Sequence, residues 1–215
     1  MAALVGHAVA EEAALLTEAK TQSPLSMELS SGYNFALREV TKDVEGAPKI
    51  NTVGLTFSGV YRLSAKDALV ANLSYATGSK SESGIDIDDE GSYKFTDDYT
   101  LDTYALTVGY RRMFDLNDKI SAFVGVNLGI ANNRVKVKED DSDGFEMTIK
   151  GSAYGFAYSL EAGVDYAVTE NANIFLIGQF AGNTASPEYK IYGVKIADGC
   201  DQLNLALRVG VRCSF

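Results

Sequence analysis

The chain has 215 residues, of which 46% are apolar and 22% are charged, and it contains 20 glycines, 3 prolines and no tryptophan. This composition excludes a collagen-like, low-complexity or fully disordered chain, and the length suits one all-β domain. The 19 basic and 29 acidic residues give a net charge of -10, which repels a phosphate backbone, so we expect no nucleic-acid partner. No apolar stretch approaches the roughly 18 residues that a membrane-spanning helix needs.

The first 24 residues are interpreted as a leader. Residues 1–10 are small and apolar and end in Ala-Val-Ala directly before Glu11, as at a secretory cleavage site, but they lack a positively charged segment. The remainder of a signal peptide and a disordered terminus are the two alternatives. Residues 11–20 predict a short helix that Ser23-Pro24 ends. We therefore divide the chain into a leader, residues 1–24, and one domain, residues 25–215.

From Leu25 onward apolar residues recur at every second position, which indicates β-strands with two different faces. The C-terminal segment is clearest, because every odd position from Leu203 to Phe215 is apolar and the even positions are polar or small. Eight segments follow this pattern, near residues 25–37, 53–63, 69–75, 104–110, 120–130, 154–168, 174–180 and 203–215. The seventh is the least regular, since Phe175 and Ile177 fall on its other face.

The connections between these segments alternate between two lengths. Short connections with good turn residues lie at 64–67, 115–118 and 169–171. Long connections, expected to be loops and rich in acidic residues, run over 39–50, 78–101, 133–152 and 183–200. The sequence therefore predicts an all-β fold, an eight-stranded antiparallel up-and-down β-barrel with one tight end and one loop-rich end.

The second face of each strand decides which way the barrel faces. It carries mostly small residues, such as Gly54, Ser58, Gly109, Gly129 and Gly163, which suit a narrow lumen. No lysine falls within an expected strand, as required if one face meets hydrocarbon. Aromatic residues gather beside the short turns (Tyr61, Tyr110, Phe114, Tyr166, Phe215) and toward the long connections (Tyr33, Phe35, Tyr75, Tyr104, Tyr154, Phe156, Phe180). Two such girdles predict a transmembrane barrel, with a soluble lipocalin-like ligand-binding barrel as the weaker alternative.

The alternation and the terminal strand, LNLALRVGVRCSF, resemble the eight-stranded bacterial outer-membrane β-barrels of the OmpA transmembrane-domain, OmpX and opacity-protein type. The resemblance covers Leu25 to Phe215. It implies a place in the bacterial outer membrane, contact with outer-membrane lipid and lipopolysaccharide, and insertion by the barrel assembly machinery, for which Phe215 looks like the terminal signal. A monomer without cofactors is expected.

Charged residues on the inward face predict a network in the lumen. Glu161 and Arg208 are equally far from the ends of their strands, so we expect them to lie at similar depth, where they can pair. A lower layer is expected to hold Glu28, Arg62, Arg111, Asp165 and Arg212. Because buried charges persist only when they are paired, this network predicts a structural plug, with a gated small pore as the alternative.

The second long connection carries a partial calcium-loop pattern. Asp86, Asp88 and Glu90 alternate, and Asp97 stands at the twelfth position of this pattern. The fifth position is Glu, the twelfth is Asp, and no flanking helices are expected, so the match is weak. A solvated anionic segment is the simpler interpretation, and acidic connections of this kind can also bridge to lipopolysaccharide phosphates through divalent cations.

Catalysis finds little support in the sequence. The single histidine, His7, lies in the leader, which leaves no histidine base for the chemistry of known outer-membrane barrel enzymes. Cys200 and Cys213 are too far apart along an extended segment for a disulfide, so we expect two free thiols. We expect no enzyme, and instead a structural, envelope-integrity or adhesin-like barrel acting through long acidic extracellular loops, with a small-solute pore as the alternative.

Overall fold

The computed structural model describes residues 24–40, 47–88, 91–141, 146–191, 194–199 and 201–215. The expected leader, apart from Pro24, and Cys200 lie outside these ranges. Within them, no helix has the length and apolar character that a bilayer-spanning helix needs. Cys213 is an exposed free thiol.

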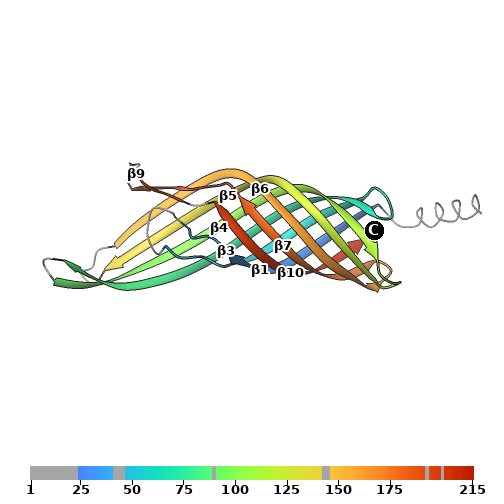
Figure 1. Cartoon of the computed structure of the whole chain (residues 1–215), viewed down its shortest axis with the longest axis horizontal. Coiled ribbons are helices and arrows are strands. Elements are labelled where there is room, and N and C mark those ends of the chain that lie inside the picture. Colours follow the sequence, from blue (N-terminus) through green and yellow to red (C-terminus); the bar gives the residue numbers. More distant parts are fainter. Residues whose placement is uncertain (1–23, 41–46, 89–90, 142–145, 192–193, 200) are drawn as a thin grey trace, which may run out of the picture.

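Eight antiparallel strands close into a ring, and a short hairpin is attached to one of them (Figure 1). The ring consists of β1 (Leu25–Ala36), β2 (Thr52–Arg62), β3 (Asp67–Asp88), β4 (Gly91–Asp115), β5 (Ile120–Asp141), β6 (Glu146–Thr169), β7 (Ala172–Asn183) and β10 (Gln202–Ser214). The hairpin consists of β8 (Glu188–Ile191) and β9 (Val194–Asp198). Ring strands pair with their neighbours in chain order, and β10 closes the ring on β1 from Ser26↔Ser214 to Ala36↔Asn204. The predicted eight-stranded up-and-down barrel is confirmed.

The strands fall into two length classes. β1, β2, β7 and β10 have 11 to 13 residues, close to the roughly 9–11 that cross a bilayer. β3, β4, β5 and β6 have 22 to 25 residues and project beyond the ring at the end opposite the C-terminus (Figure 1). We call the overhanging parts, residues 79–100 and 134–152, the extension.

The expectation of long loops over 78–101 and 133–152 is therefore wrong. The β3–β4 ladder runs without interruption to Asp88↔Gly91, and the β5–β6 ladder runs to Asp140↔Glu146. The fourth connection, 183–200, likewise contains the β8–β9 hairpin. These segments keep the apolar alternation only in part: Val135 and Val137 continue the period of two, whereas Glu82 and Asp97 interrupt it, while the backbone ladders run on past these interruptions.

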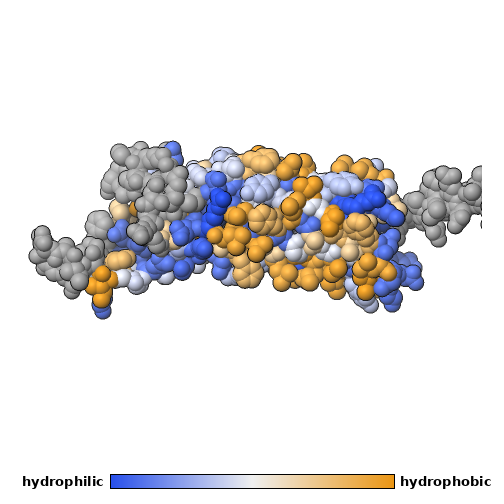
Figure 2. Space-filling model, viewed as in Figure 1, coloured by the Kyte–Doolittle hydropathy of each residue, from blue (hydrophilic) through white to orange (hydrophobic). Residues whose placement is uncertain are grey.

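The outward face of the ring is apolar, as predicted for a barrel that meets lipid. Leu73, Val108 and Leu160 are 61%, 64% and 59% exposed, and each residue of the two predicted aromatic girdles is exposed as well. On the face seen in Figure 2, apolar side chains form a band around the ring, with hydrophilic side chains at both ends. An apolar surface of this extent requires a nonaqueous partner.

Small residues on the inward face leave space in the narrow lumen for the larger inward side chains of neighbouring strands. A Cβ atom on Gly109 would collide with the Asn127 side chain and the Val126 carbonyl, and one on Gly163 would collide with Phe123. Gly59 instead has no neighbour near the position of its missing Cβ. The small inward residues are therefore a packing requirement at specific positions.

Replacing Gly109 with Ala is expected to lower the free energy of unfolding by about 1–3 kcal/mol, because the new methyl group overpacks the lumen against Asn127. Urea-induced unfolding of the refolded barrel in phospholipid vesicles measures this loss. Gly59→Ala is the matched control and should leave the unfolding midpoint nearly unchanged. Equal losses in the two variants would contradict the packing argument.

Candidate functional site

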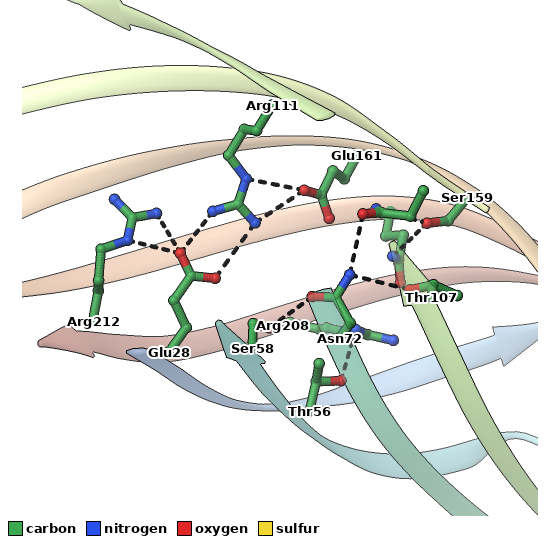
Figure 3. A network of polar contacts seen from close by, with 12 residues as sticks. Glu28, Thr56, Ser58, Asn72, Thr107, Arg111, Ser159, Glu161, Arg208 and Arg212 are labelled. Carbon is green, nitrogen blue, oxygen red and sulfur yellow. Dashed lines mark hydrogen bonds and ion pairs between the residues drawn. The ribbon is translucent and has the colours of Figure 1, made fainter. Parts of the chain in front are cut away.

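Three charged side chains from three strands meet in the half of the lumen near the short turns (Figure 3). Nη1 of Arg111 donates a hydrogen bond to Oε1 of Glu28 at 2.7 Å, and Nε of Arg212 donates to the same oxygen at 2.7 Å. Each of these residues is at most 3% exposed. One carboxylate of β1 thus links guanidinium groups of β4 and β10.

Two carboxylates of β6 complete this charged layer. Glu161 Oε1 accepts hydrogen bonds from Nε of Arg111 at 3.1 Å and from Nη2 at 3.0 Å. Asp165 Oδ2 accepts one from Nη1 of Arg212 at 2.6 Å. The five groups alternate in sign, in the order Glu161, Arg111, Glu28, Arg212, Asp165, so each buried charge has at least one opposite neighbour, the arrangement that a low-dielectric lumen requires.

Aromatic rings lie against the two guanidinium groups. The Arg111 guanidinium carbon lies 4.2 Å from the centre of the Phe123 ring, and that of Arg212 lies 5.9 Å from the Phe175 ring centre. Phe123, Phe175 and Ile177 form a buried apolar cluster. This cluster explains the irregular seventh strand of the sequence analysis, whose second apolar face is turned toward the lumen.

Glu161 and Arg208 do not form the close ion pair expected from the sequence, although Arg208 lies within electrostatic range of Glu161. The Glu161 carboxylate accepts its hydrogen bonds from Arg111, and Nη1 of Arg208 donates instead to Oγ1 of Thr56 at 2.9 Å. Arg111 is paired with Gly125, and Gly125 with Glu161, so the three lie in one row across β4, β5 and β6. Because Gly125 has no side chain, it leaves room for the contact between Arg111 and Glu161. Counting residues from the strand ends does not take this cross-strand register into account.

The two other predicted residues lie near strand ends. Arg62 is half-buried at the end of β2, within electrostatic range of Arg212 and Asp165. Phe215 follows β10 and is 68% exposed. Its role as an assembly signal stays a prediction.

Above the charged layer, neutral polar side chains line a cavity of about 110 Å³. Nδ2 of Asn72 donates to Oδ1 of Asn127 and to Oγ1 of Thr107, both at 3.1 Å, while Nδ2 of Asn127 donates to Oγ of Ser159 at 3.1 Å (Figure 3). Oγ of Ser58 donates to Oδ1 of Asn72 at 2.7 Å. Sequence reasoning missed this network, although Asn72 and Asn127 interrupt apolar strands at inward positions, and that is a readable signal.

An apolar cluster lies at the outer end of the lumen, where the extension begins. It joins the β1–β2 connection to strands β4 and β5 and to the β8–β9 hairpin, through Val40, Ala47, Ile50, Tyr99, Leu101, Val135, Val137 and Tyr189. The Tyr189 hydroxyl donates to the Val40 carbonyl at 3.1 Å. The lumen is therefore bounded by charged pairs on one side and by this apolar cluster on the other.

The candidate calcium ligands are separated by the strand register. Asp97 is paired with Glu82 on one side and with Glu139 on the other, while Asp86 is paired with Tyr93. Glu90 and the side chains of Asp86 and Asp88 lie outside the described part of the chain. In that described part, no three His, Cys, Asp or Glu side chains are grouped as a metal site would require. Calcium binding stays a prediction.

Asp97 has an unusual environment within the extension. Burial raises the pKa of its carboxyl group, and the neighbouring carboxylates of Glu82 and Asp98 raise it further, against a hydrogen bond from the Tyr99 hydroxyl at 3.3 Å. The same surroundings raise the pKa of Tyr99 to about 12. A raised carboxyl pKa means that this part of the extension gains stability as the pH falls toward that pKa.

The model of one protein family, described as the outer membrane protein beta-barrel domain, matches residues 1–212. The chain belongs to this family. It is a bacterial outer-membrane barrel, so the alternative of a soluble lipocalin-like barrel is set aside. No curated protein sequence matches the chain.

Solved barrels share the fold at low sequence identity. Neisserial surface protein A is 16% identical over 90% of this chain and 98% of its own, with a TM-score of 0.53. OprG of Pseudomonas aeruginosa is 12% identical over 90% and 97%, with a TM-score of 0.52. A major outer-membrane protein of Thermus thermophilus is 12% identical over 89% and 99%, with a TM-score of 0.51. At these identities the likeness concerns the fold alone.

A double-mutant cycle distinguishes the two possible partners of Glu161. The pair Arg111→Gln and Glu161→Gln should show a coupling of about 1–3 kcal/mol in the free energy of unfolding, because the guanidinium and carboxylate are in direct contact. Arg208→Gln with Glu161→Gln should couple more weakly, because Arg208 donates its hydrogen bond to Thr56 and interacts with Glu161 only at longer range. Urea titration of both sets of variants in vesicles gives the coupling energies. A larger coupling for Arg208 with Glu161 than for Arg111 with Glu161 would restore the pairing expected from the sequence.

Proposed function

We propose that this protein is a closed barrel that contacts partners at the cell surface through its extension. The observation that carries the proposal is the length of β3 to β6, at 22 to 25 residues about twice what a bilayer needs. In outer-membrane barrels the short turns face the periplasm, so the overhanging strands face outward. A four-stranded paired platform presents its side chains in fixed positions, as a binding surface requires.

The charged layer and the apolar cluster support a structural lumen. To conduct, the barrel would have to break paired charges that are at most 9% exposed, and leaving one partner of such a pair alone costs about 3–5 kcal/mol. No histidine lies in residues 25–215, which favours a role without catalysis. Insertion through a C-terminal signal at Phe215 and contact with lipopolysaccharide belong to the same proposal, as does a monomeric state.

A small-solute pore is the second candidate, because the cavity of about 110 Å³ is lined largely by polar side chains, among them the charged Glu28, Arg111, Glu161 and Arg208. Conduction would require movement of the charged layer and of the apolar cluster at the outer end of the lumen. In a pore, the acidic groups of the extension would attract cationic solutes and repel anionic ones at the outer entrance. Asp97, Asp98 and Asp140 are among these groups.

The surface role is tested by shortening the extension in register. Replacing residues 82–97 with Asn-Gly keeps the pair Ser81↔Asp98 beside a two-residue turn and leaves Tyr99 in the apolar cluster. We expect a folded, membrane-inserted barrel that loses adhesion of expressing cells to surfaces coated with collagen, laminin or fibronectin.

A full-length control separates shape from charge. Asp97→Asn with Asp98→Asn keeps the ladder and removes two acidic groups. If this control binds as the wild type does while the shortened variant does not, the platform itself is the binding element. Unchanged adhesion of the shortened variant, at equal surface expression, would contradict the proposal.

Conduction is tested in planar bilayers, where the wild-type barrel should give no steady current. Replacing Arg111 and Glu161 together with Ser keeps the net charge and removes the contact that crosses the charged layer, so we expect current fluctuations to appear. Arg112→Ser with Asp67→Ser removes an exposed ion pair of 2.6 Å outside the lumen and serves as the control. Steady wild-type current would favour the pore instead.

A further inference from the structure

Three cationic side chains lie together on the outward face of the extension, close to the ring. Arg134 and Lys136 of β5 and Lys150 of β6 are all exposed. The register pairs Lys136 directly with Lys150, and Arg134 with Ser152. We call these three residues the basic patch.

Like charges at directly opposite strand positions destabilise a sheet, so an anion bound between Lys136 and Lys150 would relieve their repulsion. Neither lysine forms an ion pair with a carboxylate anywhere in the described ranges. Lys138, two residues farther along β5, is instead compensated within the chain, because it forms an ion pair with Asp140 at 2.8 Å. In a chain of net charge -10, three neighbouring cations without such partners mark a site for an anion from outside the chain.

Two acidic residues, Asp102 and Glu188, lie near the patch, and in the described part of the chain neither forms an ion pair with its three cations. Asp102 stands opposite Arg134 on β4, but its Oδ1 accepts a hydrogen bond from the Tyr75 hydroxyl at 3.0 Å. Nε of Arg134 donates to Oδ1 of Asn132 at 3.1 Å, which leaves its terminal nitrogens for another acceptor. The patch borders an open groove of about 530 Å³, lined by Arg134, Val135, Lys136, Lys150, Gly151, Ser152 and Glu188. Glu188 is the one acidic residue of that lining.

The aromatic girdle fixes the height of the patch relative to the membrane. The Arg134 guanidinium carbon lies 5.2 Å from the centre of the Tyr104 ring. Tyr154 is 78% exposed and is paired with Asn132, which precedes Arg134 by two residues on the ring side. Exposed aromatic girdles mark the boundary between hydrocarbon and headgroups. The three cations therefore lie at the level of lipid headgroups.

We propose that Arg134, Lys136 and Lys150 bind the phosphate groups of a phosphorylated glycolipid in the outer leaflet. Phosphate oxygens accept paired hydrogen bonds from a guanidinium, and two ammonium groups beside it supply the opposite charge. The groove gives the headgroup room above the girdle. The inference rests on the lipopolysaccharide contact of the proposed function, for which it names the binding residues, and is independent of the surface role of the extension.

The test uses the full-length barrel in phosphatidylcholine nanodiscs containing diphosphoryl lipid A, with the retained lipid measured by native mass spectrometry. Lys136→Gln with Lys150→Gln should weaken lipid retention about fivefold for each cation removed, the effect of one charge near an anionic headgroup layer. In nanodiscs without the glycolipid the same variant should unfold at an equal or higher temperature than the wild type, because the Lys–Lys repulsion is gone.

The controls separate the lipid from other anions and from general charge. Lys66→Gln with Lys119→Gln removes the same charge from two exposed positions beside the short turns, at the opposite end of the ring from the patch, and should retain lipid as the wild type does. Dephosphorylated lipid A should bind the wild type and the patch variant equally. Equal retention of diphosphoryl lipid A by the patch variant would overturn the proposal. So would equal loss in the control variant, or inorganic phosphate displacing the lipid at millimolar concentration.

Discussion

The rest of the structure depends on satisfying every backbone hydrogen bond within a bilayer. Hydrocarbon offers no partner for an unpaired N–H or C=O group, so a sheet in a membrane must have no open edge. The β1–β10 ladder closes the ring from Ser26↔Ser214 to Ala36↔Asn204. Closure with eight strands leaves a lumen that side chains fill, and the polar network, the charged layer and the small inward residues all follow from that narrow space.

The lumen combines two kinds of interaction at different depths. Near the short turns, Arg111 and Arg212 share the carboxylate of Glu28 and stack against phenylalanine rings, so buried charges are compensated within the chain. Toward the outer end, the β1–β2 connection folds Val40 and Ile50 onto strands β4 and β5. The outer cluster also anchors the base of the extension, because Tyr99 and Val137 belong to both. The closed lumen and the ordered overhang are therefore linked by the same residues.

Above the membrane, both faces of the strands can carry polar side chains, because water is available to both. The four overhanging strands keep their ladders while carrying polar side chains outward. Glu82, Asp97 and Glu139 lie in one row, whereas Arg134, Lys136 and Lys150 gather near the girdle on the outward face. The basic patch therefore places positive charge at the headgroup level, as the proposed binding of an anionic lipid requires.

The sequence by itself determined the ring, its eight strands and the face that meets lipid, because a period of two and the position of aromatic residues are local properties of each strand. It also identified every member of the charged layer as an inward-facing residue, although not which charge pairs with which. The pairing of Glu161 with Arg111 was decided by the tertiary structure, since cross-strand register places Gly125 between them. The extension and the basic patch were decided there too: the apolar period of the extension is short and is interrupted at residues such as Glu82 and Asp97, and Lys136 and Lys150 become neighbours only through the β5–β6 ladder.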